Sequence, residues 1–183
     1  MGSGKLVILS GPSGVGKDTV IDTWRAENPD VERVVAYATR NPRAGEIDGV
    51  DYWFVSVEEF QRMAEAGAFL EHKKVVDNYY ATPIEHTERL LAEGRIAILK
   101  IDVQGALEVM KKRPDALTVI LLPPDKDALR ERLEKRATDK PEVIARRLAE
   151  ADIELAHAPH YQHQIVNDSV EKVVTLLEEL AKK

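Results

Sequence analysis

The 183-residue sequence contains no cysteine, which excludes disulfide bonds, thiolate metal sites and a cysteine nucleophile. Its stability must therefore come from side-chain packing. Aromatic residues make up only 5% of an otherwise ordinary globular composition, with 44% hydrophobic and 32% charged residues. The sequence has no apolar run long enough to cross a bilayer, and its amino terminus lacks the basic and apolar segments of a secretory signal. These absences predict a cytoplasmic protein that does not bind a membrane.

An excess of positive charge is also missing. The formal net charge is -6, so the chain lacks a broad basic field for a phosphate polymer, and we predict no nucleic-acid partner. Local basic clusters can still bind small anions. The length suits one well-packed domain, and the sequence carries no signal for an oligomeric state.

Short apolar runs alternate with longer amphipathic segments, a pattern typical of βαβ units. It predicts an α/β fold with a mainly parallel sheet flanked by helices. The predicted core strands are residues 5–10, 95–102 and 116–122, and a helix is expected after each. Ligands of such sheets bind at the carboxyl ends of the strands. One rim should therefore hold residues 11–17 together with Asp102 and the segment near Pro123.

The pattern changes between Val31 and Tyr80, where short apolar stretches are separated by turns and one brief helix, and we assign the acceptor-binding region to residues 33–83. We interpret this region as a small β-rich insertion for a second ligand. A polar stretch flanked by arginines, ATDKPE, predicts a flap, and we assign the lid to residues 137–147. The remaining segments, 4–32, 84–136 and 148–183, form the predicted core.

The most specific motif is GPSGVGKDT, which lies between a predicted strand and a predicted helix. Its three glycines allow backbone amides to turn inward around phosphate oxygens, and the helix presents its positive amino end. The lysine would reach the outer phosphates. A glycine-rich turn with a chance lysine is the alternative, which the complete spacing disfavours. The predicted nucleotide-phosphate site comprises Gly11, Pro12, Ser13, Gly14, Val15, Gly16, Lys17, Asp18 and Thr19.

The motif G-x-x-x-x-G-K-[ST] expects a hydroxyl where this chain has Asp18. A carboxylate roughly 4 Å from a phosphate charge costs on the order of 4 kcal/mol at an effective dielectric constant near 20, so compensation is needed. Asp18 could coordinate Mg²⁺. It could instead pair with Lys100 at the end of a neighbouring predicted strand. A third interpretation is that an acid simply favours the positive end of a helix.

Two arginines in TRNPRAGEIDGVDYWFV could bind a monophosphate. Arg40 and Arg43 lie three residues apart around a proline, and the hydroxyl of Tyr52 could add a donor. Surface ion pairs with Glu46 or Asp48 explain the two arginines equally well.

A second basic group follows near the flap. Arg132 and Arg136 lie four residues apart on a predicted helix, and Arg146 and Arg147 come after the flap. Mobile arginines beside a phosphate loop suit phosphoryl transfer, which depends on positioning and charge neutralisation. A solvated helix face paired with nearby acids is the alternative.

Together these residues resemble the guanylate kinase family, and the resemblance covers nearly the entire chain. The segments that carry it occur in the family's order and spacing: GPSGVGK, TRNPRAGEIDGVDYWFV, FLEH, NYYATP, KIDVQGA, ILLPP, RLEKRATD, ARRL and VND. The resemblance implies a P-loop kinase that uses ATP and Mg²⁺ to convert GMP or dGMP into GDP or dGDP.

By family motif, the resemblance also implies roles for individual residues. Four would hold the phosphate of the acceptor: Arg40, Arg43, Tyr52 and Tyr80. Three would lie near its base or the metal: Glu71, Thr82 and Asp102. Four cations would surround the transferring group: Lys17, Arg132, Arg136 and Arg147. Asn167 would lie beside the base of ATP. The metal ligands that we predict are Asp102, which the resemblance implies, and Asp18, which follows only from the preference of Mg²⁺ for carboxylate oxygens.

Four residues depart from the family pattern: Asp18, Ala36, Ala81 and Lys100. Asp18 replaces the hydroxyl of the phosphate loop, and Ala36 replaces a serine that contacts the guanine oxygen. Ala81 replaces a glycine, and Lys100 stands where Asp or Glu is usual. The GKD sequence also resembles phosphokinases that form ribose 1,5-bisphosphate, although these lack the acceptor motifs present here. A kinase for another acceptor, or a non-catalytic interaction module, therefore remains an alternative.

Overall fold

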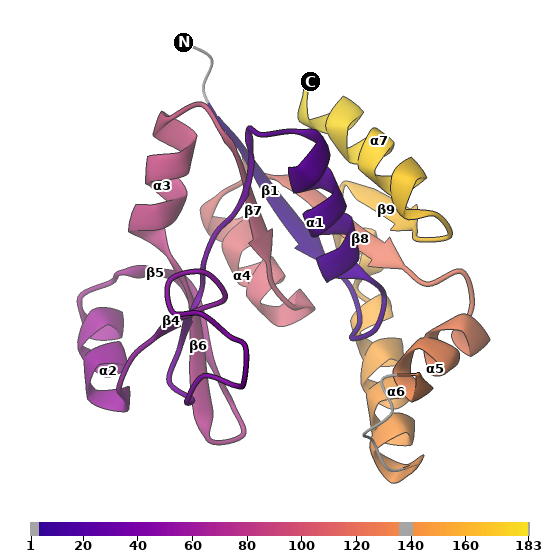
Figure 1. Ribbon diagram of the computed structural model, residues 1–183, viewed down its shortest axis with the longest axis horizontal. Coiled ribbons are helices and arrows are strands. Elements are labelled where there is room, and N and C mark those ends of the chain that lie inside the picture. The colour runs from indigo at the N-terminus through magenta and orange to yellow at the C-terminus, as the bar shows by residue number, and fades with distance from the viewer. Residues whose placement is uncertain (1–3, 136–140, 183) are drawn as a thin grey trace.

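The computed structural model describes residues 4–135 and 141–182, and these form two β-sheets (Figure 1). The larger sheet is parallel, with the strand order β2-β7-β1-β8-β9. Its strands are β1 (Lys5–Ser10), β2 (Val31–Arg33), β7 (Ile96–Lys100), β8 (Leu117–Leu122) and β9 (His163–Val166). Strand β9 was not predicted from the sequence.

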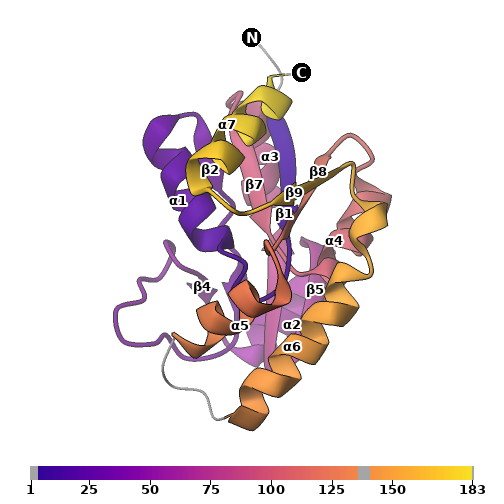
Figure 2. The ribbon, with the colours of Figure 1, turned by 90° about the vertical axis from the view of Figure 1, so that its right-hand side faces the viewer.

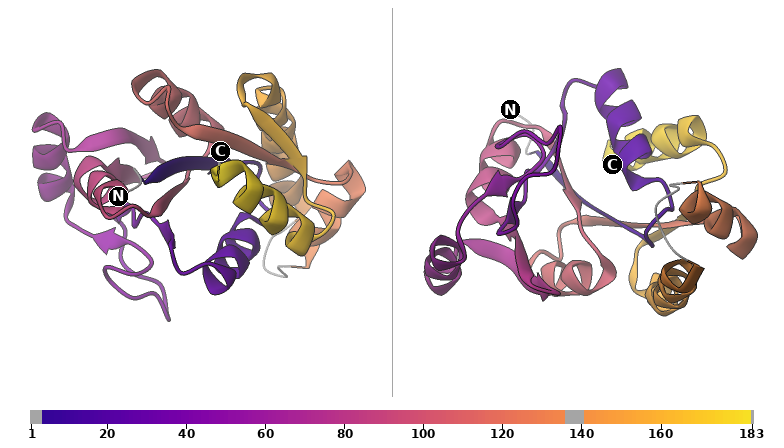
Figure 3. Two further views of the ribbon diagram at one scale, coloured as in Figure 1. Left: turned by 90° about the horizontal axis from the view of Figure 1, so that it is seen from above. Right: turned by 60° about the horizontal axis from the view of Figure 1, so that its bottom comes forward.

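Helices cover both faces of the parallel sheet (Figure 3). On one face lie α1 (Lys17–Glu27) and α7 (Val170–Ala181), and on the opposite face lie α3 (Ile84–Ala92) and α4 (Val103–Lys112). Successive residues of β1 are buried in alternate clusters, with Val7 and Leu9 against α1 and α7, and Leu6 and Ile8 against the opposite layer. The strand is therefore apolar throughout, as expected for a strand buried on both faces. The predicted class, a mainly parallel sheet flanked by helices, is confirmed.

Helix α1 is anchored to α7 by a network at its C-terminal end. The indole Nε1 of Trp24 donates a hydrogen bond to Oε2 of Glu178 at 2.7 Å. The Nδ2 atom of Asn28, which follows the last turn of α1, donates to both oxygens of the same carboxylate at 2.9 and 3.1 Å. The ring of Trp24 is almost fully buried, so α1 is fixed by packing as well as by hydrogen bonds.

The second sheet has the strand order β4-β3-β6-β5. Its strands are β3 (Tyr37–Ala38), β4 (Trp53–Phe54), β5 (Phe69–Val75) and β6 (Asn78–Pro83). Helix α2 (Val57–Glu65) covers it and buries Phe60 against Phe69, with ring centroids 4.9 Å apart. Strands β5 and β6 are antiparallel, and their register places Glu71 opposite Thr82. The sheet therefore brings together two residues from separate sequence motifs.

Two further helices extend beyond the parallel sheet at the end away from both termini (Figure 2). They are α5 (Lys126–Glu134) and α6 (Pro141–Leu155), which pack together through Leu129, Leu133 and Ala151, and the short helix η1 (Ala158–His160) follows. Most of the predicted flap lies outside the described residues, whereas 141–147 begin α6. The division into core, acceptor region and lid stays a prediction. Across residues 4–135 and 141–182, no helix is long and apolar enough to span a membrane.

Candidate functional site

The glycine-rich loop connects β1 to α1 at the carboxyl end of the central strand. Gly11, Gly14 and Gly16 have φ angles of 140°, 86° and 101°, values that glycine adopts without strain. Gly16 directly precedes α1, and a Cβ atom built there would lie 2.6 Å from Nδ2 of Asn167. Glycine is required at this position by both its backbone angle and the space available.

The ammonium group of Lys17 lies across the loop. Its Nζ atom donates hydrogen bonds to the carbonyl oxygens of Gly11 at 2.5 Å and Pro12 at 3.1 Å. These bonds hold a positive charge beside the amino end of α1, where backbone N–H groups also favour an anion. The geometry is suited to binding phosphate groups.

Arg132 and Asn167 attach the loop to remote parts of the chain. Arg132 donates to the carbonyl oxygens of Val15 and Asn167, both at 3.0 Å, and Nδ2 of Asn167 donates to Val15 at 2.8 Å. Arg132 is therefore not on a solvated helix face. Arg147 lies on α6, whereas Arg136 falls outside the described residues.

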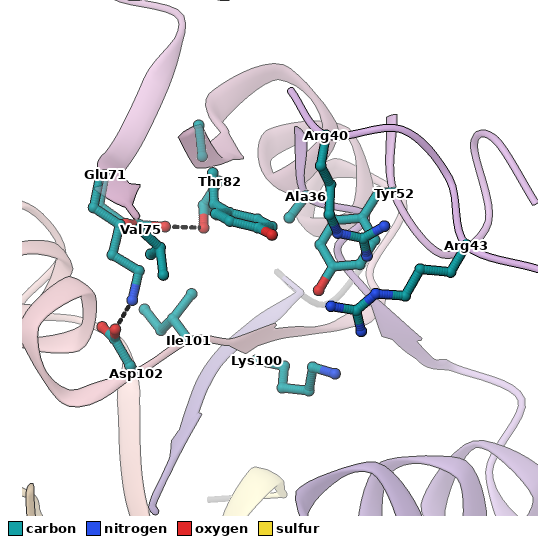
Figure 4. A pocket seen from close by; sticks show the side chains of 13 residues that line it. Ala36, Arg40, Arg43, Tyr52, Glu71, Val75, Thr82, Lys100, Ile101 and Asp102 are labelled. Carbon is teal, nitrogen blue, oxygen red and sulfur yellow. Dashed lines mark hydrogen bonds and ion pairs between the residues drawn. The ribbon is translucent and has the colours of Figure 1, made fainter. Parts of the chain in front are cut away.

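A cavity of about 300 Å³ opens between the carboxyl end of β7 and the small sheet (Figure 4). All seven residues predicted to surround the acceptor line it: Arg40, Arg43, Tyr52, Glu71, Tyr80, Thr82 and Asp102. Figure 4 shows the labelled arginines near one end and Glu71 with Thr82 near the other. Ala36, Ala81 and Lys100 line it too, so three of the four departures from the family pattern lie in one place.

The guanidinium of Arg40 is held by Glu46 in a bidentate ion pair, with N–O distances of 2.6 and 2.7 Å. Glu46 also accepts a hydrogen bond from the backbone N–H of Arg43 at 2.7 Å. The two interpretations of Arg40 are thus compatible, since it pairs with Glu46 and still lines the cavity. This pairing raises the pKa of Arg40. The hydrogen bond from Arg40 and, to a lesser degree, the hydrogen bond from the backbone N–H of Arg43 lower the pKa of Glu46 to about 2.

Glu71 and Thr82 form a buried polar pair at the opposite end. The Thr82 hydroxyl donates to Oε1 of Glu71 at 2.6 Å. Thr82 is 2% exposed and Glu71 is 6% exposed. Oε2 lies against Gly105 of α4, where a Cβ atom would be only 3.0 Å away. Burial raises the pKa of Glu71, and the hydrogen bond from Thr82 opposes this shift. A carboxylate fixed in this way can accept hydrogen bonds from the N–H groups of a planar ligand.

The structure contains the hypothesised pair between Asp18 and Lys100, with an Oδ1–Nζ distance of 2.5 Å. Partial burial acts to raise the pKa of Asp18. The hydrogen bond and charge of Lys100, together with the charges of Arg33 and Lys17, outweigh burial, so the pKa of Asp18 is below its usual value.

Sequence reasoning assigned no role to Lys73, which lines the same cavity and forms an ion pair with Asp102. Asp102 also caps α4 by accepting from the N–H of Gly105 at 2.9 Å. Strand alternation could have identified Lys73, because it follows Glu71 by two residues in β5 and so shares its face.

Comparisons with known proteins agree on one family. The family model described as Guanylate kinase matches residues 3–183. A curated guanylate kinase from Thermosynechococcus vestitus is 45% identical over 175 residues, which cover 96% of this chain and 92% of the relative. The crystal structure of guanylate kinase from Anaplasma phagocytophilum matches with a TM-score of 0.76 and 30% identity, covering 100% of this chain and 86% of the other. The SH3-kinase fragment of tight junction protein 3 has a TM-score of 0.55 and 14% identity, covering 100% of this chain and 58% of the other, a likeness in fold alone.

Proposed function

Because this chain belongs to the guanylate kinase family, we propose that its cavity binds GMP while the glycine-rich loop binds the phosphates of ATP. The protein is an enzyme that transfers the terminal phosphoryl group of ATP to GMP. The observation that carries the assignment of the sites is the gathering of seven predicted acceptor residues in one cavity beside the loop. We extend the proposal to dGMP.

The two ends of the cavity suit the two ends of GMP. Arg40, Arg43, Tyr52 and Tyr80 would bind the phosphate, since forked guanidiniums and hydroxyl groups match its oxygens. At the opposite end, Glu71 would accept hydrogen bonds from the guanine edge, with Thr82 fixing one of its oxygens. This arrangement would place the acceptor phosphate toward the loop that holds ATP.

Charge neutralisation would provide most of the catalysis, as is general for phosphoryl transfer. Lys17 would follow the migrating group, and Arg132, Arg136 and Arg147 would surround it. In the present structure Arg132 contacts backbone carbonyls of Val15 and Asn167, so its proposed role requires a rearrangement when substrates bind. Closure of a lid over residues 137–147 would supply that movement. Asn167 would lie beside the base of ATP.

Mg²⁺ is the proposed metal, and the residues fit it in a limited way. The side chain of Asp18 is 58% exposed, and only its Oδ1 atom is bound to Lys100, so a hard oxygen ligand remains available. Asp102 would contribute near the acceptor only after releasing a partner, because its Oδ1 atom accepts from the N–H of Gly105 and its Oδ2 atom pairs with Lys73. Within residues 4–135 and 141–182, no group of three or more His, Cys, Asp or Glu side chains forms a metal site. A Mg²⁺ ion bound here would be held mainly by phosphate oxygens and water, and it would neutralise phosphate charge.

The proposal is tested by measuring ADP formation with GMP, dGMP, other nucleoside monophosphates and ribose 1,5-bisphosphate, with Mg²⁺ and with excess EDTA. We expect turnover with GMP that EDTA abolishes. A preference for ribose 1,5-bisphosphate would refute the acceptor assignment, and a lack of turnover with every acceptor would favour an interaction module.

Arg40→Ala provides the matched test of the cavity. We expect the KM for GMP to rise by about 10-fold or more, because a charge-assisted contact to phosphate is worth about 1.5–3 kcal/mol. The KM for ATP should change far less, and an equal change in both would contradict the assignment. We also propose a cytoplasmic location, which fractionation of cells would test.

A further inference from the structure

The ion pair between Lys100 and Asp18 joins two parts of the site. Lys100 is the last residue of β7 and lines the proposed GMP cavity. Asp18 lies in the first turn of α1, directly after Lys17, and lines a neighbouring cleft. The ammonium of Lys100 therefore lies between the cavity and the first turn of α1.

The two members of this pair differ in exposure. The side chain of Lys100 is 24% exposed, whereas that of Asp18 is 58% exposed. Water screens an exposed charge more strongly than a partly buried one. A ligand in the cavity should therefore be affected more by the charge of Lys100 than by that of Asp18, even though the formal charges cancel.

Lys100 also lies at the appropriate end of the cavity. Figure 4 shows its side chain directed toward the side of the cavity that holds Arg43, away from Glu71 and Thr82. Arg40 has both terminal nitrogens engaged by Glu46, so much of its charge is already offset. A phosphate with two negative charges would gain from a further cation at this end.

We propose that Lys100 binds the phosphate of GMP and that Asp18 holds Lys100 in place as its counter-ion. This inference rests on the proposed acceptor site. The pair acts as a unit, because Lys100 attracts the phosphate and also neutralises a carboxylate that would otherwise repel it. Removing Lys100 alone loses the attraction and leaves Asp18 unpaired beside the phosphate.

The test measures GMP binding by isothermal titration calorimetry in the absence of ATP and Mg²⁺. Lys100→Met should weaken GMP binding by about 10-fold or more, as expected for loss of a charge-assisted contact. Lys100→Arg should stay within about threefold of the wild-type protein because it keeps the charge. The control is Lys126→Met on α5, which removes an exposed lysine paired with Asp152 and should leave GMP affinity unchanged.

A second arm tests the counter-ion. Asp18→Asn added to Lys100→Met should recover at least about threefold of the lost GMP affinity, since it removes an unpaired carboxylate. ATP binding, titrated separately, should also weaken in Lys100→Met, because Asp18 then lies unpaired at the phosphate loop, and adding Asp18→Asn should return ATP affinity to within about threefold of the wild type. GMP affinity should stay below that of the wild type in the double variant, because the cation is missing. Wild-type GMP affinity in Lys100→Met, no recovery in the double variant, or full recovery of GMP affinity in the double variant would each overturn the inference. Arg40→Ala distinguishes a failure of this inference from a failure of the proposed acceptor site. If Arg40→Ala also leaves GMP binding unchanged, the acceptor site itself is wrongly assigned.

Discussion

Glu71→Gln should separate GMP recognition from the stability of the fold. Glutamine has nearly the volume of glutamate, and its oxygen can still accept the hydrogen bond that Thr82 donates at 2.6 Å. The Oε2 atom of Glu71, which lies beside Gly105, is replaced by an NH₂ group, so a hydrogen-bond acceptor becomes a donor. A guanine N–H facing it would lose a charge-assisted hydrogen bond. That loss is worth about 1.5–3 kcal/mol, so kcat/KM for GMP should fall by about 10- to 150-fold.

The same substitution should not destabilise the unliganded protein. Burial raises the folded-state pKa of Glu71 above its ordinary value of 4.5. The folded state therefore binds the proton more tightly than the unfolded state. The contribution of this group to stability is greatest below pH 4.5 and is lost as pH rises through the folded-state pKa. Near pH 7.5, Glu71→Gln removes a poorly solvated charge, and the unfolding midpoint should equal or exceed that of the wild type.

Two measurements test these expectations. A coupled assay of ADP formation gives the activity, and circular dichroism gives the thermal unfolding midpoint. Glu59→Gln is the control, because the side chain of Glu59 on α2 is 40% exposed and pairs with Arg62 at 2.7 Å. The control should retain GMP activity. A fall of several degrees in the midpoint of Glu71→Gln, with equal losses for GMP and ATP, would mean that Glu71 is structural and would refute the reasoning.

Two substitutions test the phosphate loop. Lys17→Ala should abolish phosphoryl transfer, because it removes the charge that follows the migrating group, and turnover at the wild-type rate would refute the assignment. Gly16→Ala should reduce the free energy of unfolding by about 1–3 kcal/mol, since its backbone is left-handed and its Cβ would meet Asn167. Urea unfolding measures this cost, and an unchanged midpoint would contradict the geometry.

The local motifs could be predicted because each is defined by residues that are close together in the sequence. The glycine-rich loop follows a strand whose predicted range, 5–10, is that of β1. The acceptor residues were identified as separate motifs, and the resemblance alone indicated that they belong to one site. Strand β9 was missed because its sequence, HQIV, is short and half polar, with only Ile165 buried.

Contacts between distant segments could not be predicted in this way. Arg132 binds the carbonyl oxygen of Val15, which lies 117 residues earlier. Side-chain chemistry does not specify a bond to one backbone carbonyl among many, so spacing on the helix suggested only a solvated or catalytic face. The pair between Lys100 and Asp18 was inferable, because a carboxylate in the first turn of one helix and a lysine at the end of a neighbouring strand are both unusual and can compensate each other.

The anchoring of α1 has a consequence for motion. At its C-terminal end, Glu178 binds Trp24 and Asn28, and at its N-terminal end Asn167 binds the carbonyl of Val15. Helix α1 is thus held at both ends, and the glycine-rich loop that precedes it is held with it. With ATP on this loop and GMP in the cavity, as proposed, the approach of the two substrates should come from displacement of the small sheet, because α5 is itself bound to the loop through Arg132. Backbone amides of α1 should accordingly exchange with deuterated solvent more slowly than those around β3 and β4.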